Sequence, residues 1–380
     1  MFGAYRARSN RFDYAINMAA SDQHTRRPTL ADVARAAGVS VSTASIAFSG
    51  SGPVSEATRE KVHAAAAQLG YDGPDPRARS LRQGRSGVVG VVLEGSLLYA
   101  FRDPVTSITL DGVATALGPL GAGLLLLTDS GVHEAGAGAA SVETAAVDAV
   151  ILLGCSTRVD HSIEVFKRRD IPVVSVEGPS RPELVEVTLD NRSASVVAAR
   201  HLSSLGHSRV AVVTLATGDG HAAGPVTDDI DISVPVTRER LLGTREVYPD
   251  APAHSAVHNT PEDGRRAALA LLEAPASSRP TAIIVQADLL AVGVIQAVEE
   301  LGLVVGADVS VIGFDGIRID GLAHDLTTMV QPASAKGHAA GAAVTALLAG
   351  ERPSTPIAFT CELHVGTTTG PAPADADSAQ

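Results

Sequence analysis

Hydrophobic and polar positions follow two different patterns in this chain, and the change comes near Val88. From there on, short apolar runs alternate with longer segments in which apolar residues recur at helical spacing. Continuous apolar strands separated by helices are typical of parallel sheets covered on both faces. We therefore predict an α/β body built from parallel, doubly wound sheets. The apolar runs are VVGVVL, LLLLT, DAVILLG, IPVVSVE, VAVVT, TAIIVQAD and VSVIGFD.

The region before Val88 shows only helical patterns, beginning with two short helices within residues 29–49. Thr29 is suited to cap the first helix, because Asp32 completes a capping box three residues later. Gly38 can end that helix in a left-handed conformation, and a second helix then covers residues 41–48. Two short helices joined at a glycine predict a helix-turn-helix unit. The alternative is an ordinary helical hairpin inside a globular core.

The second of these helices is small and rich in hydroxyl groups. Ala44, Ala47 and Phe48 are expected to face inward, which leaves short side chains on the outer face. Such a face can approach the major groove of DNA closely. A third helix is expected from Ser55, as its N-cap, to Gly70.

The order of these segments resembles the N-terminal DNA-binding domain and hinge of the LacI/GalR (lactose-repressor) family of transcription regulators. The matching segments are TLADVARAAGVS, STAS, VSEATREKV, LGY and PDPRARSLRQGRSGVVGVV. The resemblance extends over nearly the whole chain and implies a small all-α helix-turn-helix head that binds double-stranded operator DNA. The residues expected to contact DNA are Thr29, Leu30, Ser40, Val41, Ser42, Thr43, Ser45, Ile46, Ser49, Ser55, Arg79 and Leu81.

The expected hinge is short and basic, with four arginines between residues 77 and 85. A helix this short does not form by itself, because nucleation costs more than a few hydrogen bonds return. In the family that it resembles, paired hinges become helical on operator DNA, and a leucine from each wedges into the minor groove. Leu81 in PRARSL matches that leucine. The alternative is a flexible linker with incidental arginines.

Later segments resemble the family's ligand-binding core, which is similar to periplasmic sugar-binding proteins and has two lobes with a cleft between them. The matching segments are residues 189–214, residues 279–315 and LTTMVQP at 326–332. The expected bounds are a mobile tail at 1–27, the head at 28–73, the hinge at 74–86, a ligand-binding domain at 87–368 (lobe one at 87–189 and 318–331, lobe two at 190–317 and 332–368), and a disordered tail at 369–380.

Two charged residues match the family's ligand-gripping positions: Arg240 in RERLLG and Asp288 in VQADLLAVG. A guanidinium offers a planar fork of donors, and a carboxylate accepts from hydroxyl or N–H groups, so the pair suits a polar ligand. A surface ion pair is the alternative for each. Further cleft candidates are Tyr99, Phe101 and Asp103, for which local packing is the alternative, and the weaker Glu177 and Asp190.

Two features depart from the family pattern. Recognition helices in the family often have arginine where this chain has Ile46, which cannot make the two hydrogen bonds that read a guanine. An isoleucine can contact a thymine methyl group, so we expect an unusual operator half-site. The second departure is an acidic loop at 218–239, which is interpreted either as a lid on the cleft or as a disordered segment.

Charge is divided unevenly along the chain. Residues 1–86 hold 12 Lys and Arg against 7 Asp and Glu, and the remainder holds 18 against 35, within a total net charge of −12. A positive head on a negative body favours binding of a polyanion at one end. Two cysteines far apart do not suggest a disulfide framework or a zinc site, and we expect reduced thiols. No secretory signal or membrane span is recognised, which favours the cytoplasm.

The sequence contains none of the phosphate-binding, nucleophile-elbow or zinc-protease motifs, so neither an enzyme nor a bound cofactor is expected. We expect a homodimeric repressor, with a tetramer as the alternative, whose operator affinity depends on a small polar effector such as a sugar. The rival interpretations are a sugar-binding receptor without DNA function and a sugar-processing enzyme with an accessory head.

Overall fold

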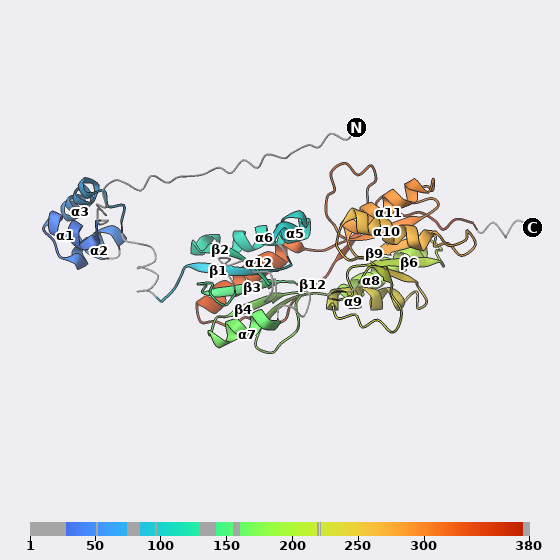
Figure 1. Ribbon diagram of the computed structural model, residues 1–380, viewed down its shortest axis with the longest axis horizontal. Helices are drawn as coiled ribbons and strands as arrows, with labels where there is room; N and C mark the ends of the chain where they lie inside the picture. Colours follow the sequence, from blue (N-terminus) through green and yellow to red (C-terminus); the bar gives the residue numbers. More distant parts are fainter. Residues whose placement is uncertain are drawn as a thin grey trace, which may run out of the picture. The chain divides into compact units, whose positions relative to one another are not determined.

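The computed structural model forms two compact units that divide after Gly84, a helical head and an α/β body (Figure 1). The expected tail at 1–27 and the hinge residues 74–83 lie outside the described residues. The residues that the structure describes are 28–50, 52–73, 84–95, 97–129, 142–154, 160–218, 220 and 222–374.

The head contains the three helices that the sequence predicts. Thr29 and Asp32 form the expected capping box, and Gly38 ends the first helix with a φ of 65°. Ser40 and Ser55 cap the next two helices through their side chains. Small residues form the core, in which Val33, Ala44 and Val62 are buried. The helices are α1 (Leu30–Ala37), α2 (Val41–Ser49) and α3 (Glu56–Leu69).

The first lobe of the body is a sheet in the order β12-β5-β4-β3-β1-β2, and every pair in it is parallel. Its strands are β1 (Val88–Glu94), β2 (Gly123–Asp129), β3 (Ala149–Leu153), β4 (Val173–Val176), β5 (Val185–Leu189) and β12 (Ile357–Phe359). Its helices are α5 (Leu97–Arg102), α6 (Pro104–Leu117), α7 (Asp160–Arg168) and α12 (Ala333–Leu348), with a 3-10 turn at Gly118–Leu120.

Both faces of this sheet are covered, because alternate residues of the strands enter two different cores. Val91 and Ile151 pack with residues of α6 and α12, whereas Val92 and Leu152 pack with Phe166 of α7. Figure 1 shows α6 and α12 on one side of the sheet and α7 on the other. Burial on both faces explains why the strands appear in the sequence as continuous apolar runs.

The second lobe is a sheet in the order β13-β11-β10-β9-β6-β8-β7, parallel except for its two edge strands. Its strands are β6 (Val210–Thr214), β7 (Gly224–Pro225), β8 (Ala253–Ser255), β9 (Ala282–Val285), β10 (Ser310–Asp315), β11 (Thr327–Val330) and β13 (Glu362–His364). Its helices are α8 (Asn191–Ser204), α9 (Pro235–Arg245), α10 (Pro261–Leu272) and α11 (Asp288–Glu300). None of the helices that the structure describes is long and apolar enough to cross a membrane.

The expected division between the lobes was wrong at the return crossing. Residues 318–331 were assigned to lobe one, but β11 pairs with β10 in the second sheet. Helix α12 was assigned to lobe two, but its Ala340 and Val344 are buried in the core of the first lobe. The chain therefore returns after β11 instead of before it. A third crossing follows β12, since β13 belongs to the second sheet.

Two segments pack against the second lobe, the 218–239 loop, for which a lid and a disordered segment were the alternatives, and the start of the expected disordered tail. In the 218–239 loop, Gly224–Pro225 forms an edge strand. Val226 and Ile232 pack in the hydrophobic core that contains Leu241. At the C-terminal end, Thr369 and Gly370 bond to His201 and Ser310, so the expected disordered tail does not begin at residue 369. Both segments gain hydrogen bonds and apolar contacts that their composition alone does not indicate.

Candidate nucleic-acid interface and effector site

The outer face of α2 presents the short side chains that the sequence predicts. The Val41 side chain is 50% exposed, and Ser42 and Ser49 are exposed as well. Ser40 accepts a hydrogen bond of 3.0 Å from the backbone of Thr43, which fixes the start of the helix. On the same helix, three further predicted contacts are half-buried: Thr43, Ser45 and Ile46. Elsewhere in the head, Thr29 and Ser55 act as helix caps, and Leu30 packs against the core. The two predicted contacts in the hinge, Arg79 and Leu81, lie outside the described residues.

Aromatic contacts hold α2 against the rest of the head. Phe48 meets His63 edge to face at a centroid distance of 5.0 Å, and Tyr71 at 5.7 Å. Ile46 lies beside Gly52, where a Cβ atom would come within 3.1 Å of its Cγ2. The hydroxyl-bearing face is therefore held rigidly at the surface of the head, as direct contact with DNA bases requires.

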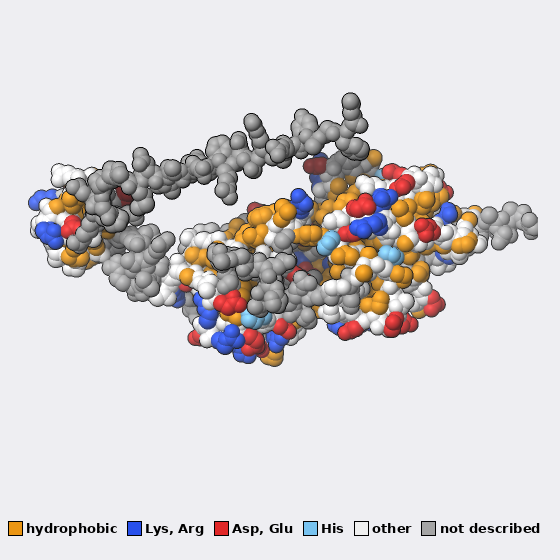
Figure 2. Space-filling model, viewed as in Figure 1, with side chains coloured by type: hydrophobic (Ala, Val, Ile, Leu, Met, Phe, Trp, Pro, Cys, Tyr) orange, Lys and Arg blue, Asp and Glu red, His pale blue; other side chains and the backbone are white. Residues whose placement is uncertain are grey.

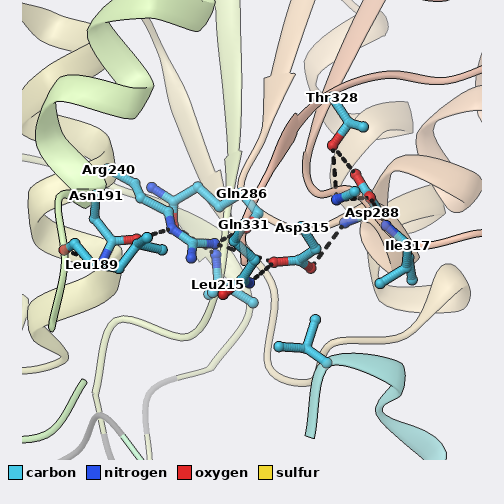
Figure 3. Close-up of polar contacts among 12 residues, drawn as sticks. Leu189, Asn191, Leu215, Arg240, Gln286, Asp288, Asp315, Ile317, Thr328 and Gln331 are labelled. Carbon is cyan, nitrogen blue, oxygen red and sulfur yellow. Dashed lines mark hydrogen bonds and ion pairs between the residues drawn. The ribbon is translucent and has the colours of Figure 1, made fainter. Parts of the chain in front are cut away.

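In the body, Arg240 of α9 is nearly buried at the junction of the two lobes (Figure 3). Its Nε donates to Asn191 at 2.8 Å, and its Nη1 donates to the Gln286 carbonyl and lies 3.9 Å from Asp315. Its guanidinium stacks 3.5 Å above the centroid of the Phe314 ring. These contacts fix the plane of the guanidinium.

Asp288 begins α11 and is completely buried. Its carboxylate accepts hydrogen bonds from Gly316 N at 2.8 Å, from Ile317 N at 2.9 Å and from the Thr328 hydroxyl at 2.7 Å. Burial raises the pKa of Asp288 to about 7, although these hydrogen bonds and the charge of Arg240 oppose the rise. Asp288 therefore holds the loop after β10 in place, and its own oxygen atoms are occupied.

Asp315, at the end of β10, is the acidic group beside Arg240. Its φ is 128°, and its carboxylate accepts from Gln331 Nε2 at 2.6 Å and from the Asp288 backbone at 3.4 Å. Burial raises the pKa of Asp315 well above its usual range; Arg240 opposes this shift, whereas Asp288 and Asp103 add to it.

Glu177 joins the same network from the first lobe. It follows β4 with a φ of 55°, accepts from Asn191 Nδ2 at 3.1 Å and pairs with the buried ammonium group of Lys336. Burial favours the neutral acid, but the charges of Lys336 and Arg240 and the hydrogen bonds keep the pKa of Glu177 below its ordinary value. Lys336 also donates to Gln331 Oε1.

These contacts close a ring at the crossings between the two lobes of the body. We call it the hinge ring, after the hinge between the lobes and not after the expected DNA-binding hinge at 74–86. Of its members, sequence analysis identified only Arg240 and Glu177. Asn191, Asp315 and Gln331 lie in the family-like segments, but nothing distinguished them from their neighbours. Nothing in the sequence marked Lys336 as a site residue, except that it is a charged residue in a helix made mostly of small residues. The hinge ring consists of Glu177, Asn191, Arg240, Asp315, Gln331 and Lys336.

The other predicted cleft residues make none of the hydrogen bonds or ion pairs of the ring. Tyr99 of α5 faces the second lobe, where its ring centre is 5.5 Å from that of His258; burial raises the pKa of its hydroxyl to about 12. Asp103 caps α6 by accepting from Val105 and Thr106. Asp190 is exposed and caps α8, and Phe101 is 62% exposed on α5.

A pocket of about 260 Å³ lies next to Asp315, between the lobes. Val105 and Ile108 of α6 line one side, and Ile317 of the second lobe lines another. The pocket therefore combines apolar walls from both lobes with an acidic group and an amide at its floor, as small-molecule sites commonly do.

Comparison with known proteins supplies independent information on both units. Residues 29–73 match the model of bacterial regulatory proteins of the lacI family, and residues 199–369 match a periplasmic binding protein-like domain. The chain is 31% identical to the HTH-type transcriptional regulator IpsA of Corynebacterium glutamicum, over 90% of this chain and 98% of that protein. It is 35% identical to an HTH-type transcriptional regulator of Mycobacterium tuberculosis, over 91% and 98% of the two chains.

The chain belongs to the LacI family.

The fold agrees with that of a solved transcriptional regulator. A complex of the transcriptional regulator CelR with cellobiose superposes with a TM-score of 0.61 and 25% sequence identity, over 90% of this chain and all of that one. The expected family and the expected fold, a helix-turn-helix head with a two-lobed α/β body, are therefore confirmed. As a LacI-family protein, the chain is a DNA-binding transcriptional regulator.

Proposed function

We propose that this LacI-family regulator is a repressor whose operator affinity is controlled by a small polar effector bound between the lobes of its body. The observation that carries the proposal is the pairing of Arg240 with Asp315 beside a pocket to which both lobes contribute. A ligand that contacts both lobes changes the equilibrium between their open and closed arrangements. Ligand binding and DNA binding are then linked, typically by about 1–3 kcal/mol, and each changes the affinity for the other by the same factor.

The proposed effector is a polyhydroxyl compound such as a sugar. Asp315 and Gln331 line the pocket and supply an acceptor and an amide, and the Arg240 guanidinium lies 3.9 Å from Asp315. The solved CelR complex contains a sugar, cellobiose, which supports this class of ligand. Asp315 takes the ligand-contacting role first expected of Asp288, whose oxygen atoms are occupied by internal donors.

The proposed DNA site is the outer face of α2 together with the hinge. Val41, Ser42 and Ser45 would enter the major groove, while Leu81 would wedge into the minor groove. Ile46 would contact a thymine methyl group in place of a guanine edge. Selection of binding sites from random DNA should therefore return half-sites with thymine opposite Ile46; recovery of guanine there would contradict the assignment.

A homodimer is proposed because a LacI-type head reads one half-site and two heads are needed for a palindrome. Hydrophobic side chains lie at the surface over α5 and α6 (Figure 2). Leu98 and Phe101 are each 62% exposed, and Leu124 is 38% exposed on β2, an edge strand of the first sheet. A second copy that covers this face would remove apolar surface from water.

The proposed function is tested with a gel shift on the DNA that flanks the protein's own gene. The regulator should bind at about nanomolar concentration and lose affinity steeply as salt increases, because phosphate contacts release counterions. Sugars that raise its melting temperature should then change the affinity for that DNA. Weak binding that is equal for unrelated DNA would contradict the proposal and would favour a ligand receptor without DNA function.

A further inference from the structure

Lys336 is the least expected member of the hinge ring. It lies in α12, immediately after the return crossing, and only 1% of it is exposed. Lysine is almost never buried this completely unless it is paired, and a buried ion pair gives little net stability compared with a well-packed apolar pair. A hydrophobic residue would serve the packing of the first lobe as well, so the charge indicates a role beyond packing.

The two acceptors of Lys336 lie in different parts of the body. Glu177 belongs to the first lobe and leads through Asn191 to Arg240, with distances of 3.1 and 2.8 Å. Gln331 lies on the return crossing and leads to Asp315 at 2.6 Å. Asp315 and Gln331 line the candidate effector pocket, and Arg240, which also belongs to the second lobe, lies 3.9 Å from Asp315 (Figure 3). One ammonium group is thus connected to Arg240 and to Asp315 by two separate routes.

The direction of each hydrogen bond in these routes follows from Lys336. An ammonium group can only donate, so the oxygen of the Gln331 amide must face Lys336, and its nitrogen must face Asp315. The Glu177 carboxylate can only accept, so the nitrogen of the Asn191 amide faces Glu177, and its oxygen faces Arg240. Without the charge, either amide is free to rotate, and then Asp315 loses the donor of Gln331 or Arg240 loses the acceptor of Asn191.

We propose that Lys336 is a positioning residue that orients Arg240 and Asp315 from the first lobe and fixes the crossings between the lobes in one arrangement. Movement of the return crossing away from Glu177 would break the ring, so Arg240 and Asp315 keep their orientation only while Lys336 joins Glu177 to Gln331. This inference rests on the proposed function for its biological meaning. It is tested by a measurement that uses neither DNA nor effector, so that its failure is distinguishable from failure of the proposed function.

The chain provides its own probe of the ring. Cys361 follows the third crossing and is half-buried; burial raises the pKa of its thiol to about 12, while the charges of Arg240 and Lys336 act in the opposite direction. The chain has 2 cysteines, so Cys155→Ser leaves Cys361 as its only thiol. The rate at which iodoacetamide alkylates Cys361, followed by mass spectrometry, reports how often the third crossing opens.

In the Cys155→Ser protein, Lys336→Met should accelerate alkylation of Cys361 by about tenfold or more, because it leaves Glu177 and Gln331 without their shared donor. Loss of the positive charge alone would raise the pKa of the thiol and slow the reaction, so acceleration can come only from exposure. Lys167→Met is the matched control: it removes the same charge from an exposed pair with Glu183, and the rate should not change. A rate for Lys336→Met equal to that of the parent would overturn the proposal.

Two further variants separate positioning from general loss of stability. Leu152→Ala should destabilise the first lobe through the core on its α7 face, which contains no residue of α12, and well below its melting temperature Cys361 should still react slowly. Equal acceleration in that variant would overturn the proposal. If Lys336→Met does not fold, Glu177→Gln combined with Lys336→Met removes the unpaired charge as well. Rapid alkylation of this double variant supports the ring, and a parental rate overturns it.

Discussion

Two buried carboxyl groups in the second lobe, Asp288 and Asp315, are stabilised by their surroundings to different extents. Asp288 accepts from two backbone N–H groups and a hydroxyl, whereas Asp315 accepts from one amide side chain and lies beside Arg240. Both have a pKa above the ordinary value because burial disfavours the charged form. Protonation of these residues should therefore be linked to folding.

The raised pKa of Asp288 predicts the direction in which stability changes with pH. The folded pKa of Asp288 is about 7, against an ordinary value of 3.8, so between these pH values the folded state binds more protons than the unfolded state. The contribution of Asp288 to stability therefore falls as pH rises from about 4 to about 7. Asp288→Asn should remove this dependence, since an amide can accept from both backbone groups and donate to Thr328.

We expect the stability of Asp288→Asn relative to the parent to increase over that pH range in urea unfolding. A stability difference that does not change with pH, or that decreases, would contradict the assignment. Asp325→Asn provides the control, because Asp325 pairs only with His364 at an exposed site in the described structure, and no comparable increase is expected there.

Sequence analysis found part of the candidate effector site because arginine and aspartate at family-like positions carry recognisable chemistry. It selected Asp288 because VQADLLAVG matches the family's ligand-gripping aspartate, and only the structure shows that internal donors cover this carboxylate while Asp315 lines the pocket. Lys336 could not be found, since its partners lie 159 and 5 residues away and a lysine in a helix normally faces water.

At the scale of secondary-structure elements, the crossing of α6 and α12 depends on glycine. A Cβ atom at Gly112 would come within 2.1 Å of the Ser334 carbonyl oxygen, and one at Gly337 within 1.9 Å of the Thr109 carbonyl oxygen. The two helix backbones therefore pack at a distance that excludes any side chain at these positions. This crossing fixes α12, and with it Lys336, against the first sheet.

Gly112→Ala should consequently lower the free energy of unfolding by about 1–3 kcal/mol or more, because backbone atoms cannot yield as a side chain does. Gly123→Ala is the matched control in β2 of the same lobe: apart from its chain neighbours, the nearest atom to the new Cβ would be Val88 Cγ2 at 3.8 Å, an ordinary contact. It should be neutral or stabilise by about 0.4–1 kcal/mol. Urea denaturation of both variants measures the difference, and equal effects would refute the close-packing argument.

The ends of the head helices could be predicted because the residues that determine a helix end lie close together in the sequence. Caps at Thr29, Ser40 and Ser55 and the left-handed Gly38 follow from residues within one turn of each other. The assignment of LTTMV to a lobe failed because strand pairing is decided by residues distant in the sequence. An apolar run fits either sheet, and the register of Thr327 with Ile312 is visible only in the fold.

At the scale of the whole molecule, association of two copies is proposed to depend on the apolar face that includes α5 and β2. Leu98→Lys would place a charge on this face, and desolvation of that charge should oppose contact. We expect this variant to sediment as a monomer and to lose operator affinity, while Leu301→Lys, at a position 45% exposed in the second lobe, should leave both unchanged. A Leu98→Lys variant that still dimerises would place the interface elsewhere.

The discontinuity of the first lobe also determines the order in which the protein can be completed on the ribosome. Its sheet lacks one strand until Ile357–Phe359 has been synthesised, and the face that α6 and α12 share is only partly covered until Ala333–Leu348 has formed. The head needs no residue beyond Tyr71 for its core, so it is free to fold as soon as it emerges. Each nascent chain therefore presents a finished reading head while most of its sensing body is still incomplete.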